Sequence, residues 1–342
     1  MLSKISNSFN IIISFVIVII LVGCRRDSLK IDVSDIDVKI EIERFDEDLF
    51  ASKPEITQNE INQLSQKYAV FFEIFARSVL GIREDSGAAM FPVLNDFIND
   101  PDIEKIRNDV GIQYSSLENI SNEIEDGFKH YKYYFPGKPV PKIITFISGM
   151  QYAIITADSL AAIGLDMYLG ENYIFYEALG LPKFKTAKMT KDYIVLDCFK
   201  GWAQSEYEQD QAQRDMLSQI IYHGKILHFM EAMRPREEKN KIIGYTKEQL
   251  DWCLENEANI WSFFISNNLL YSADQVKIAK FINEGPGTGG FPAEAPSMLG
   301  NYIGWQIIKA FREKNKNISL AQLMEINDAQ QILNKSGYKP KK

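Results

Sequence analysis

The stretch "PKIITFISGMQYAIITADSLAAIGLDMYLG", residues 141–170, decides the fold class of this chain. Its two parts, "PKIITFISG" and "YAIITADSLAAIGLDMYLG", are rich in β-branched residues and are interrupted by glycines. Such segments are typical of strands, and because few residues separate them we expect them to pair as neighbours. Most of the remaining chain has helical periodicity. The sequence therefore predicts an α+β fold that is rich in helices and has one small sheet.

One more strand is predicted before this sheet, and helices are predicted on both sides of it in the sequence. The segment "IDVKIEIERF", 36–45, alternates Ile36, Val38, Ile40 and Ile42 with charged residues, which is the pattern of a strand with one buried face. Apolar residues recur at helical spacing over 56–81, 91–99, 115–134, 210–233, 246–270, 273–281, 297–314 and 319–332. No linker rich in Pro, Gly or Ser divides the middle of the sequence, so we predict a single domain over 36–342.

The beginning of the sequence predicts export and attachment of a lipid. The apolar run 11–22 is about a dozen residues long, which fits the core of a secretory signal, whereas a membrane-spanning helix needs roughly 18 residues or more. The run ends in "LVGC", which looks like a bacterial lipobox. We therefore predict a signal peptide over 1–23, acylation of Cys24, and a polar tether over 24–35. The alternative is an uncleaved signal anchor with an incidental cysteine.

Charge and cysteine content limit the partners and the covalent chemistry. The formal net charge is -8, and removal of residues 1–23 takes away only Lys4, which leaves -9. An acidic chain is a poor binder of nucleic acid, so we predict no such partner. Besides Cys24, the chain has Cys198 and Cys253 in apolar surroundings. One disulfide in an oxidising compartment and two separately buried thiols both fit this pattern.

The stretch "DMLSQIIYHGKILHFMEAMRP", residues 215–235, invites a catalytic interpretation because it places two of the three histidines on a helix after the sheet. A zinc peptidase carries H-E-x-x-H, in which the histidines lie four residues apart on one helix face. His223 and His228 are five apart, roughly 140° around the axis, so a regular helix does not converge them on a metal ion. Gly224 stands where the glutamate base would be. We therefore predict no metal site and no catalytic residue here, and we expect the pair His228 and Glu231 to be a surface or cap contact.

Three weaker signals have structural explanations. The loop "GPGTGG", residues 285–290, lacks the G-K-[ST] end of a phosphate-binding loop, and we predict that its glycines form turns. We expect Gly300 and Gly304 to let two helices approach closely. Asp166 and Glu171 would make a carboxylate pair if they lay together, but we favour an interpretation as turn residues at the end of a strand.

Six segments together resemble the gliding-motility-associated lipoprotein family GldB of Bacteroidota. They are the lipobox ending in Cys24, "IERFDEDLF" (42–50), "GLDMYLGENY" (164–173), "IYHGKILHFMEAMRP" (221–235), "GYTKEQLDWCLENEANIWSFFISNNLLYS" (244–272) and "PSMLGNYIGWQIIKAF" (296–311). They follow one another over nearly the whole mature chain. The resemblance implies a role in surface gliding and, through shared machinery, in type IX protein secretion. It leaves the molecular activity open.

The order of segments in this family also looks like that of HExxH metallopeptidases, with a sheet, a histidine-containing helix and then a "W...NE..IW" helix. On that comparison His223 or Tyr222 lies near the first metal ligand and Glu257 is a relic of a later one, although H-E-x-x-H itself is absent. The resemblance therefore implies a degenerate, zincin-like architecture. In it, His223, His228 and Glu257 mark a relic site of a pseudoenzyme that needs no cofactor.

We therefore expect a non-enzymatic lipoprotein of the cell envelope that supports gliding or secretion machinery through contacts with other envelope proteins. No run of acidic residues follows Cys24, where Arg25 and Arg26 stand instead, so we favour a position facing the periplasm. The alternative is a divergent metallopeptidase-like hydrolase, which would need converging ligands and bound metal. A third class, a binding protein for a small molecule or glycan, would need a deep aromatic-lined pocket.

Overall fold

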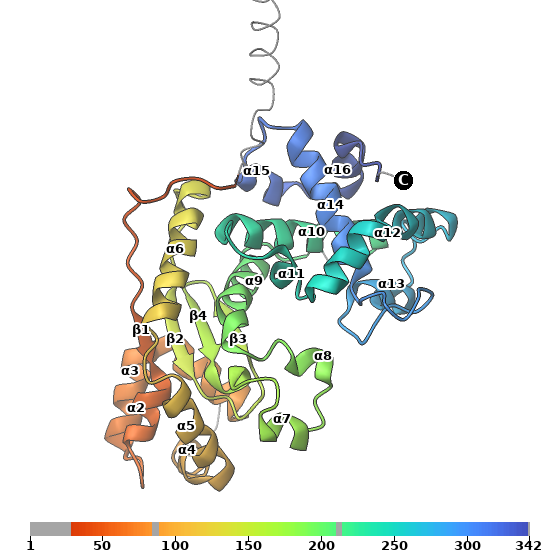
Figure 1. The fold of residues 1–342 in the computed structure, drawn as a ribbon. Coiled ribbons are helices and arrows are strands. Elements are labelled where there is room, and N and C mark those ends of the chain that lie inside the picture. Colours follow the sequence, from red (N-terminus) through yellow and green to blue (C-terminus); the bar gives the residue numbers. More distant parts are fainter. Residues whose placement is uncertain (1–28, 84–88, 210–213, 341–342) are drawn as a thin grey trace, which may run out of the picture. The chain divides into compact units, whose positions relative to one another are not determined.

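The computed structural model of the protein describes residues 29–83, 89–209 and 214–340. The predicted signal peptide, Cys24 and the first residues of the predicted tether lie outside the described residues. From Val33 onward the chain forms one compact unit. This unit combines one small mixed sheet with many helices, so the predicted α+β class is confirmed (Figure 1).

The sheet has four strands in the order β1-β2-β4-β3. The strands are β1 (Ile42–Arg44), β2 (Lys142–Phe146), β3 (Ile154–Ala157) and β4 (Leu160–Gly164). β2 is parallel to both β1 and β4, with Ile143 opposite Ile42 and Ala161, whereas β3 and β4 form an antiparallel hairpin. Every residue of β4 is buried, which is expected of a central strand covered on both faces. The two parts of the stretch 141–170 therefore pair, as predicted.

The predicted strand 36–45 is only partly confirmed, because residues 42–44 form β1 and the residues before them form no strand. The backbone before β1 is held by a helix instead of a neighbouring strand. The N–H of Ile40 donates to the Glu125 carboxylate, and its carbonyl oxygen accepts from the Ser121 hydroxyl. Both residues lie on α6 (Glu118–Tyr134). The alternating apolar residues correctly predicted one buried side. They could not predict which groups would form hydrogen bonds with the backbone N–H and C=O groups.

Helices flank the sheet in the first half of the chain. They are α2 (Phe45–Ala51), α3 (Gln58–Ile74) with a π-helical continuation (Phe75–Val79), α4 (Met90–Asn99), α5 (Pro101–Gln113) and α6. Phe71 and Phe75 pack edge-on against Phe146 at the end of β2. The sequence predicted α3, α4 and α6 but missed α5, which Asp100 begins by accepting hydrogen bonds from the N–H groups of the first turn.

The second half is almost entirely helical. It contains α7 (Ile174–Ala178), α8 (Lys183–Thr186), α9 (Ile194–Glu206), α10 (Met216–Met233), α11 (Lys239–Ile243), α12 (Lys247–Ser266), α13 (Gln275–Ile282), α14 (Leu299–Lys314), α15 (Leu320–Glu325) and α16 (Ala329–Ser336). The single helix predicted over 319–332 is two helices. Asp328 caps the second of them by accepting from the N–H of Gln331, so the chain restarts at this point.

Helix α10 is the central helix of this half. Its residues are buried except Ser218, Tyr222 and His223, and it contacts α6, α9, α14 and α16. Figure 1 shows α14 crossing it. At the crossing, a Cβ on Gly304 would lie 1.7 Å from the carbonyl oxygen of Ile220, and a Cβ on Gly224 would lie 2.3 Å from the carbonyl carbon of Gly304. The predicted close approach of two helices at Gly304 is confirmed.

We expect Gly304→Ala to lower the free energy of unfolding by about 1–3 kcal/mol or more, because its Cβ would collide with backbone that cannot turn aside. The matched control is Gly111→Ala on α5, where a Cβ meets nothing within 4 Å. That change should be neutral or stabilise by up to ~1 kcal/mol, because alanine favours helix. Urea unfolding followed by circular dichroism measures both. Equal unfolding midpoints for the two variants would contradict the backbone contact.

Candidate functional site

A cavity of about 590 Å³ lies among α9, α10, α11 and the start of α14. We call it the α9–α10 cavity. Its volume falls within the range of small-molecule sites. Of the residues singled out from the sequence, His223 lines it, one position before the glycine that contacts α14. The helix crossing therefore fixes one wall of the cavity and directs a histidine toward it.

Helix α9 contributes two charged residues to the lining of the cavity. Asp197 and Lys200 are one helical turn apart, and both line the cavity. The hydroxyl of Tyr168 donates a hydrogen bond to Asp197 at 3.0 Å. Burial raises the pKa of the Asp197 carboxyl, and the charge of Lys200 and the bond from Tyr168 only partly offset this effect. Lys200 itself makes no hydrogen bond or ion pair within the described part of the chain.

His223 is a neutral imidazole at physiological pH. Burial and the nearby positive charge of Lys200 lower its pKa to about 4. A neutral ring offers one N–H donor and one acceptor nitrogen to the cavity. Asn301, on α14, adds an acceptor, because its amide nitrogen donates to the carbonyl of Ile282 while its Oδ1 is buried without a partner among the described residues. The cavity thus presents a cation and a neutral donor, and an unsatisfied acceptor lies just below its surface.

His228 lies outside the cavity in a buried network. Its Nδ1 donates to Glu231 at 3.2 Å, the indole N–H of Trp305 donates to the same carboxylate oxygen at 3.0 Å, and Lys239 lies 2.7 Å from the other oxygen. Burial alone would raise the pKa of Glu231, but the hydrogen bond from His228 and the charges of His228 and Lys239 lower it to about 2. The expected surface or cap contact is therefore wrong, because both His228 and Glu231 are buried.

Glu257 also binds internal partners. On α12, its two carboxylate oxygens accept from the hydroxyls of Tyr302 at 2.9 Å and Tyr338 at 2.8 Å. His223, His228 and Glu257 therefore have separate surroundings. Within residues 29–83, 89–209 and 214–340, no group of three or more His, Cys, Asp or Glu residues is arranged to hold a metal ion. The structure does not bring the three predicted relic residues together as a ligand set.

The other candidates from the sequence have structural roles. Cys198 and Cys253 are free, buried thiols, so the disulfide alternative is wrong. The buried Asp166 carboxylate accepts from the N–H groups of Ser148 at 3.1 Å and Met150 at 2.7 Å, which fastens the connection between β2 and β3. Glu171 is exposed. The interpretation of Asp166 as a turn residue after a strand is therefore the better one.

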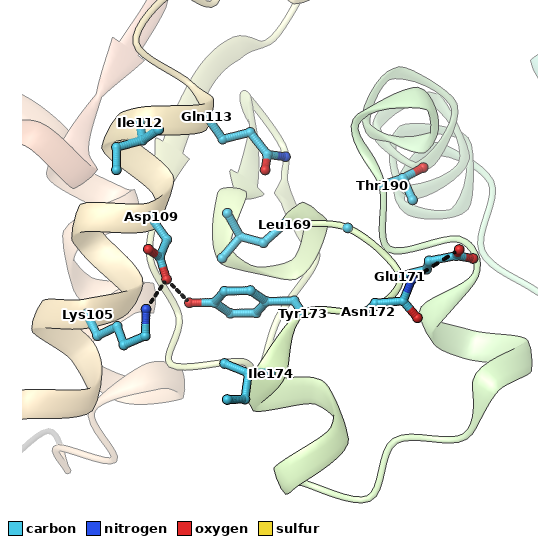
Figure 2. A pocket seen from close by; sticks show the side chains of 11 residues that line it. Lys105, Asp109, Ile112, Gln113, Leu169, Glu171, Asn172, Tyr173, Ile174 and Thr190 are labelled. Carbon is cyan, nitrogen blue, oxygen red and sulfur yellow. Dashed lines mark hydrogen bonds and ion pairs between the residues drawn. The ribbon is translucent and has the colours of Figure 1, made fainter.

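A second concave surface lies between α5 and the segment that leads into α7. Its volume is about 860 Å³, and we call it the α5–α7 hollow. Figure 2 shows Asp109 between two donors, Tyr173 at 2.7 Å and Lys105 at 3.0 Å. These bonds outweigh the effect of burial and lower the pKa of Asp109. Ile112 and Ile174 also line the hollow, and they are 79% and 62% exposed.

Comparison with protein families shows which family this chain belongs to. A family model described as gliding motility protein GldB matches residues 26–340. The chain belongs to this family. Comparison with the curated proteins and with the solved structures found no match. The match includes both concave surfaces and all three predicted relic residues. Among the described residues, none of the helices is long and apolar enough to cross a membrane.

Sequence reasoning missed Asp197 and Lys200. Both lie in the run "YIVLDCFKG", 193–201, which drew notice only for Cys198. The available signal was a pair of opposite charges three residues apart within an otherwise apolar helix, because charged residues on a buried helix need a polar cavity or partners. For Asn301 no such signal existed, since its unpaired oxygen depends on where Ile282 lies.

We expect His223 to make folding sensitive to acid. Its folded pKa of about 4 lies below the ordinary 6.5, so the unfolded chain binds more protons between these values. Stability from this group is complete above pH 6.5 and is lost as the pH falls toward 4, by up to about 1.4 kcal/mol per pH unit. Urea unfolding at pH 7 and pH 5 should show a smaller loss in His223→Gln than in the wild type. Equal losses would contradict a half-buried His223 that stays neutral in the folded protein.

Proposed function

We propose that this chain is a cell-envelope lipoprotein, anchored through acylated Cys24 and facing the periplasm. In this proposal it acts in gliding motility and in the associated type IX secretion machinery through contacts with other envelope proteins, without catalysis. The family match over 26–340 supports the role in gliding. The anchor is supported by the position of Cys24, which follows an apolar run and precedes the matched segment by two residues.

The observation that carries the non-enzymatic proposal is that the carboxylates nearest to a peptidase pattern already have fixed partners. Glu231 accepts from His228 and Trp305, and Glu257 accepts from two tyrosines. A general base needs a free lone pair within reach of a water molecule or a substrate proton. Both oxygens of each carboxylate have partners inside helix interfaces. We therefore propose that these groups fix the orientation of the helices and do not act as general bases.

We also propose that the fold is a degenerate form of the HExxH metallopeptidase architecture. The order of elements supports this, since the mixed sheet is followed by α10 with His223 and then by α12 with Glu257. Gly224 follows His223, where the glutamate base would stand, and its Cα faces the backbone of Gly304. A glutamate at this position would collide with α14. The backbone of α14 thus occupies the space that the catalytic side chain would need.

The α5–α7 hollow supports action through protein contacts. Two isoleucines, Ile112 and Ile174, expose most of their apolar surface beside a concave region, whereas isolated exposed apolar residues need no explanation. Residues of this kind anchor partner side chains when they surround a depression. Asp109 accepts hydrogen bonds from Lys105 and Tyr173, and these bonds hold one wall of the hollow in place. We assign this surface to an envelope protein that inserts an apolar side chain.

Cys24→Ala should leave the chain unprocessed or released from the membrane, because no thiol remains to carry the lipid. Metabolic labelling with a radioactive or alkyne-bearing fatty acid, followed by detergent phase partitioning, measures the effect. The wild type should be labelled and the variant should not be. Continued labelling of Cys24→Ala would overturn the lipid anchor.

Ile112→Glu and Ile174→Glu should each abolish or strongly reduce gliding while the protein remains as abundant as the wild type. The physical reason is that a carboxylate at the centre of an apolar contact loses its hydration without a partner, which costs several kcal/mol in the complex and nothing in the free protein. Colony spreading and immunoblotting of a complemented deletion strain measure function and abundance.

The matched control is Val276→Glu on α13, which is 74% exposed and lies outside the hollow. It should glide normally. Normal gliding of both isoleucine variants would refute the assignment of the hollow as a contact surface. Zinc-dependent peptide hydrolysis by the purified wild type would favour the alternative, a divergent metallopeptidase-like hydrolase.

A further inference from the structure

We propose that the α9–α10 cavity binds a single-chain amphiphile, an aliphatic chain with an anionic head group that also carries a hydrogen-bond donor. This inference goes beyond the proposed function and does not depend on it. Three observations lead to it, namely the aliphatic lining, the excess of cations and the unpaired acceptor of Asn301.

The lining suits an aliphatic chain. Four of the ten methionines of the chain line the cavity, together with several isoleucines and leucines, among them Ile226, Leu227 and Ile243. Methionine is unbranched and flexible, so it adapts to ligands without a fixed shape. Among the described lining residues, the phenol rings are those of Tyr168 and Tyr193 only. The deep aromatic pocket expected of a glycan-binding protein is therefore not what this cavity offers.

The charged residues select an anion. Four lysines line the cavity against two carboxylates, although the whole chain is acidic at -8. Lys188 and Lys241 are bound to Glu284 and Asp192, which leaves Lys185 and Lys200 to meet a ligand. Lys185 is exposed, so Lys200 is the less hydrated of the two. It lies on the same helix face as Asp197, whose ionised form burial disfavours. A carboxylate or phosphate beside Lys200 would receive a charge-assisted hydrogen bond, and the neutral His223 supplies a second donor.

Asn301 adds an independent requirement. Its side chain is only 7% exposed, and its Oδ1 has no partner among the described residues. An unsatisfied buried acceptor costs about 1–3 kcal/mol, so a group that enters the cavity is favoured if it brings a donor. A hydroxyl or an amide N–H close to the anionic head would satisfy this oxygen once the side chain rotates it toward the cavity, because Oδ1 lies below the cavity surface. The structure thus points to a hydroxylated or N-acylated acid in preference to a plain hydrocarbon chain.

The test is photo-crosslinking of the purified full-length protein with 3-hydroxydodecanoate that carries a diazirine at the end of its chain. Peptides that carry the aliphatic lining should be labelled, above all those of α10 and α11, which supply Ile226, Leu227, Met230, Ile242 and Ile243. Excess dodecanoate and dodecyl phosphate should both suppress the labelling, and dodecanol should not, since it lacks the charge. Labelling elsewhere, or equal suppression by dodecanol, would overturn the proposal.

Variants test the head-group contacts. Lys200→Met should reduce labelling at least about tenfold, since a hydrogen bond with a charged partner is lost, whereas Lys200→Arg should retain it. Lys183→Met, an exposed lysine of α8 outside the cavity, is the matched control and should label normally. In Asn301→Ala, the preference for the 3-hydroxy probe over a probe without the hydroxyl should disappear. Unchanged labelling of Lys200→Met, with its unfolding midpoint preserved, would refute the site.

Discussion

The backbone contact between α10 and α14 is the constraint on which the rest of the structure depends. Helix α10 joins the crossing to α6 and α9, and through α9 to the sheet, while α14 joins it to α12, α13 and α16. Gly224 and Gly304 bring the two backbones closer than any side chain would permit. Because His223 adjoins Gly224 and Asn301 lies about one turn before Gly304, the same crossing sets the distance between two walls of the α9–α10 cavity.

The buried carboxylates then fix the rotation of the helices that the glycines bring together. Tyr302 and Trp305 lie one turn apart on α14 and donate to Glu257 on α12 and Glu231 on α10, respectively. A buried carboxylate that loses its donors leaves an uncompensated charge, which is strongly destabilising, so alternative rotations of α14 are disfavoured. Glu231 and Glu257 thereby act as restraints that favour one arrangement of these helices over the others.

The sequence predicted the elements that local residue patterns determine. The predictions failed where hydrogen bonds to residues far away in the sequence determine the structure. The strands in 141–170 and the helices α3, α6, α10, α12 and α14 follow from periodicity, whereas α5 and α9 were missed. Gly304 followed from its spacing to Gly300 within an apolar helix. The part 36–41 of the predicted strand was misassigned because its backbone bonds to α6, more than 80 residues away. Likewise, no local pattern shows that Glu257 binds Tyr338, so its isolation from His223 and His228 required the tertiary structure.

Tyr168 links the two concave surfaces physically. Its carbonyl oxygen accepts from Gln113, which lines the α5–α7 hollow, at 2.8 Å, and from the hydroxyl of Tyr114 at 2.6 Å. Its own hydroxyl donates to Asp197 in the α9–α10 cavity. The residue is fully buried, so neither polar end can turn to water. A displacement of Asp197 by an occupant of the cavity must therefore either break this bond or move a residue that supports the wall of the hollow.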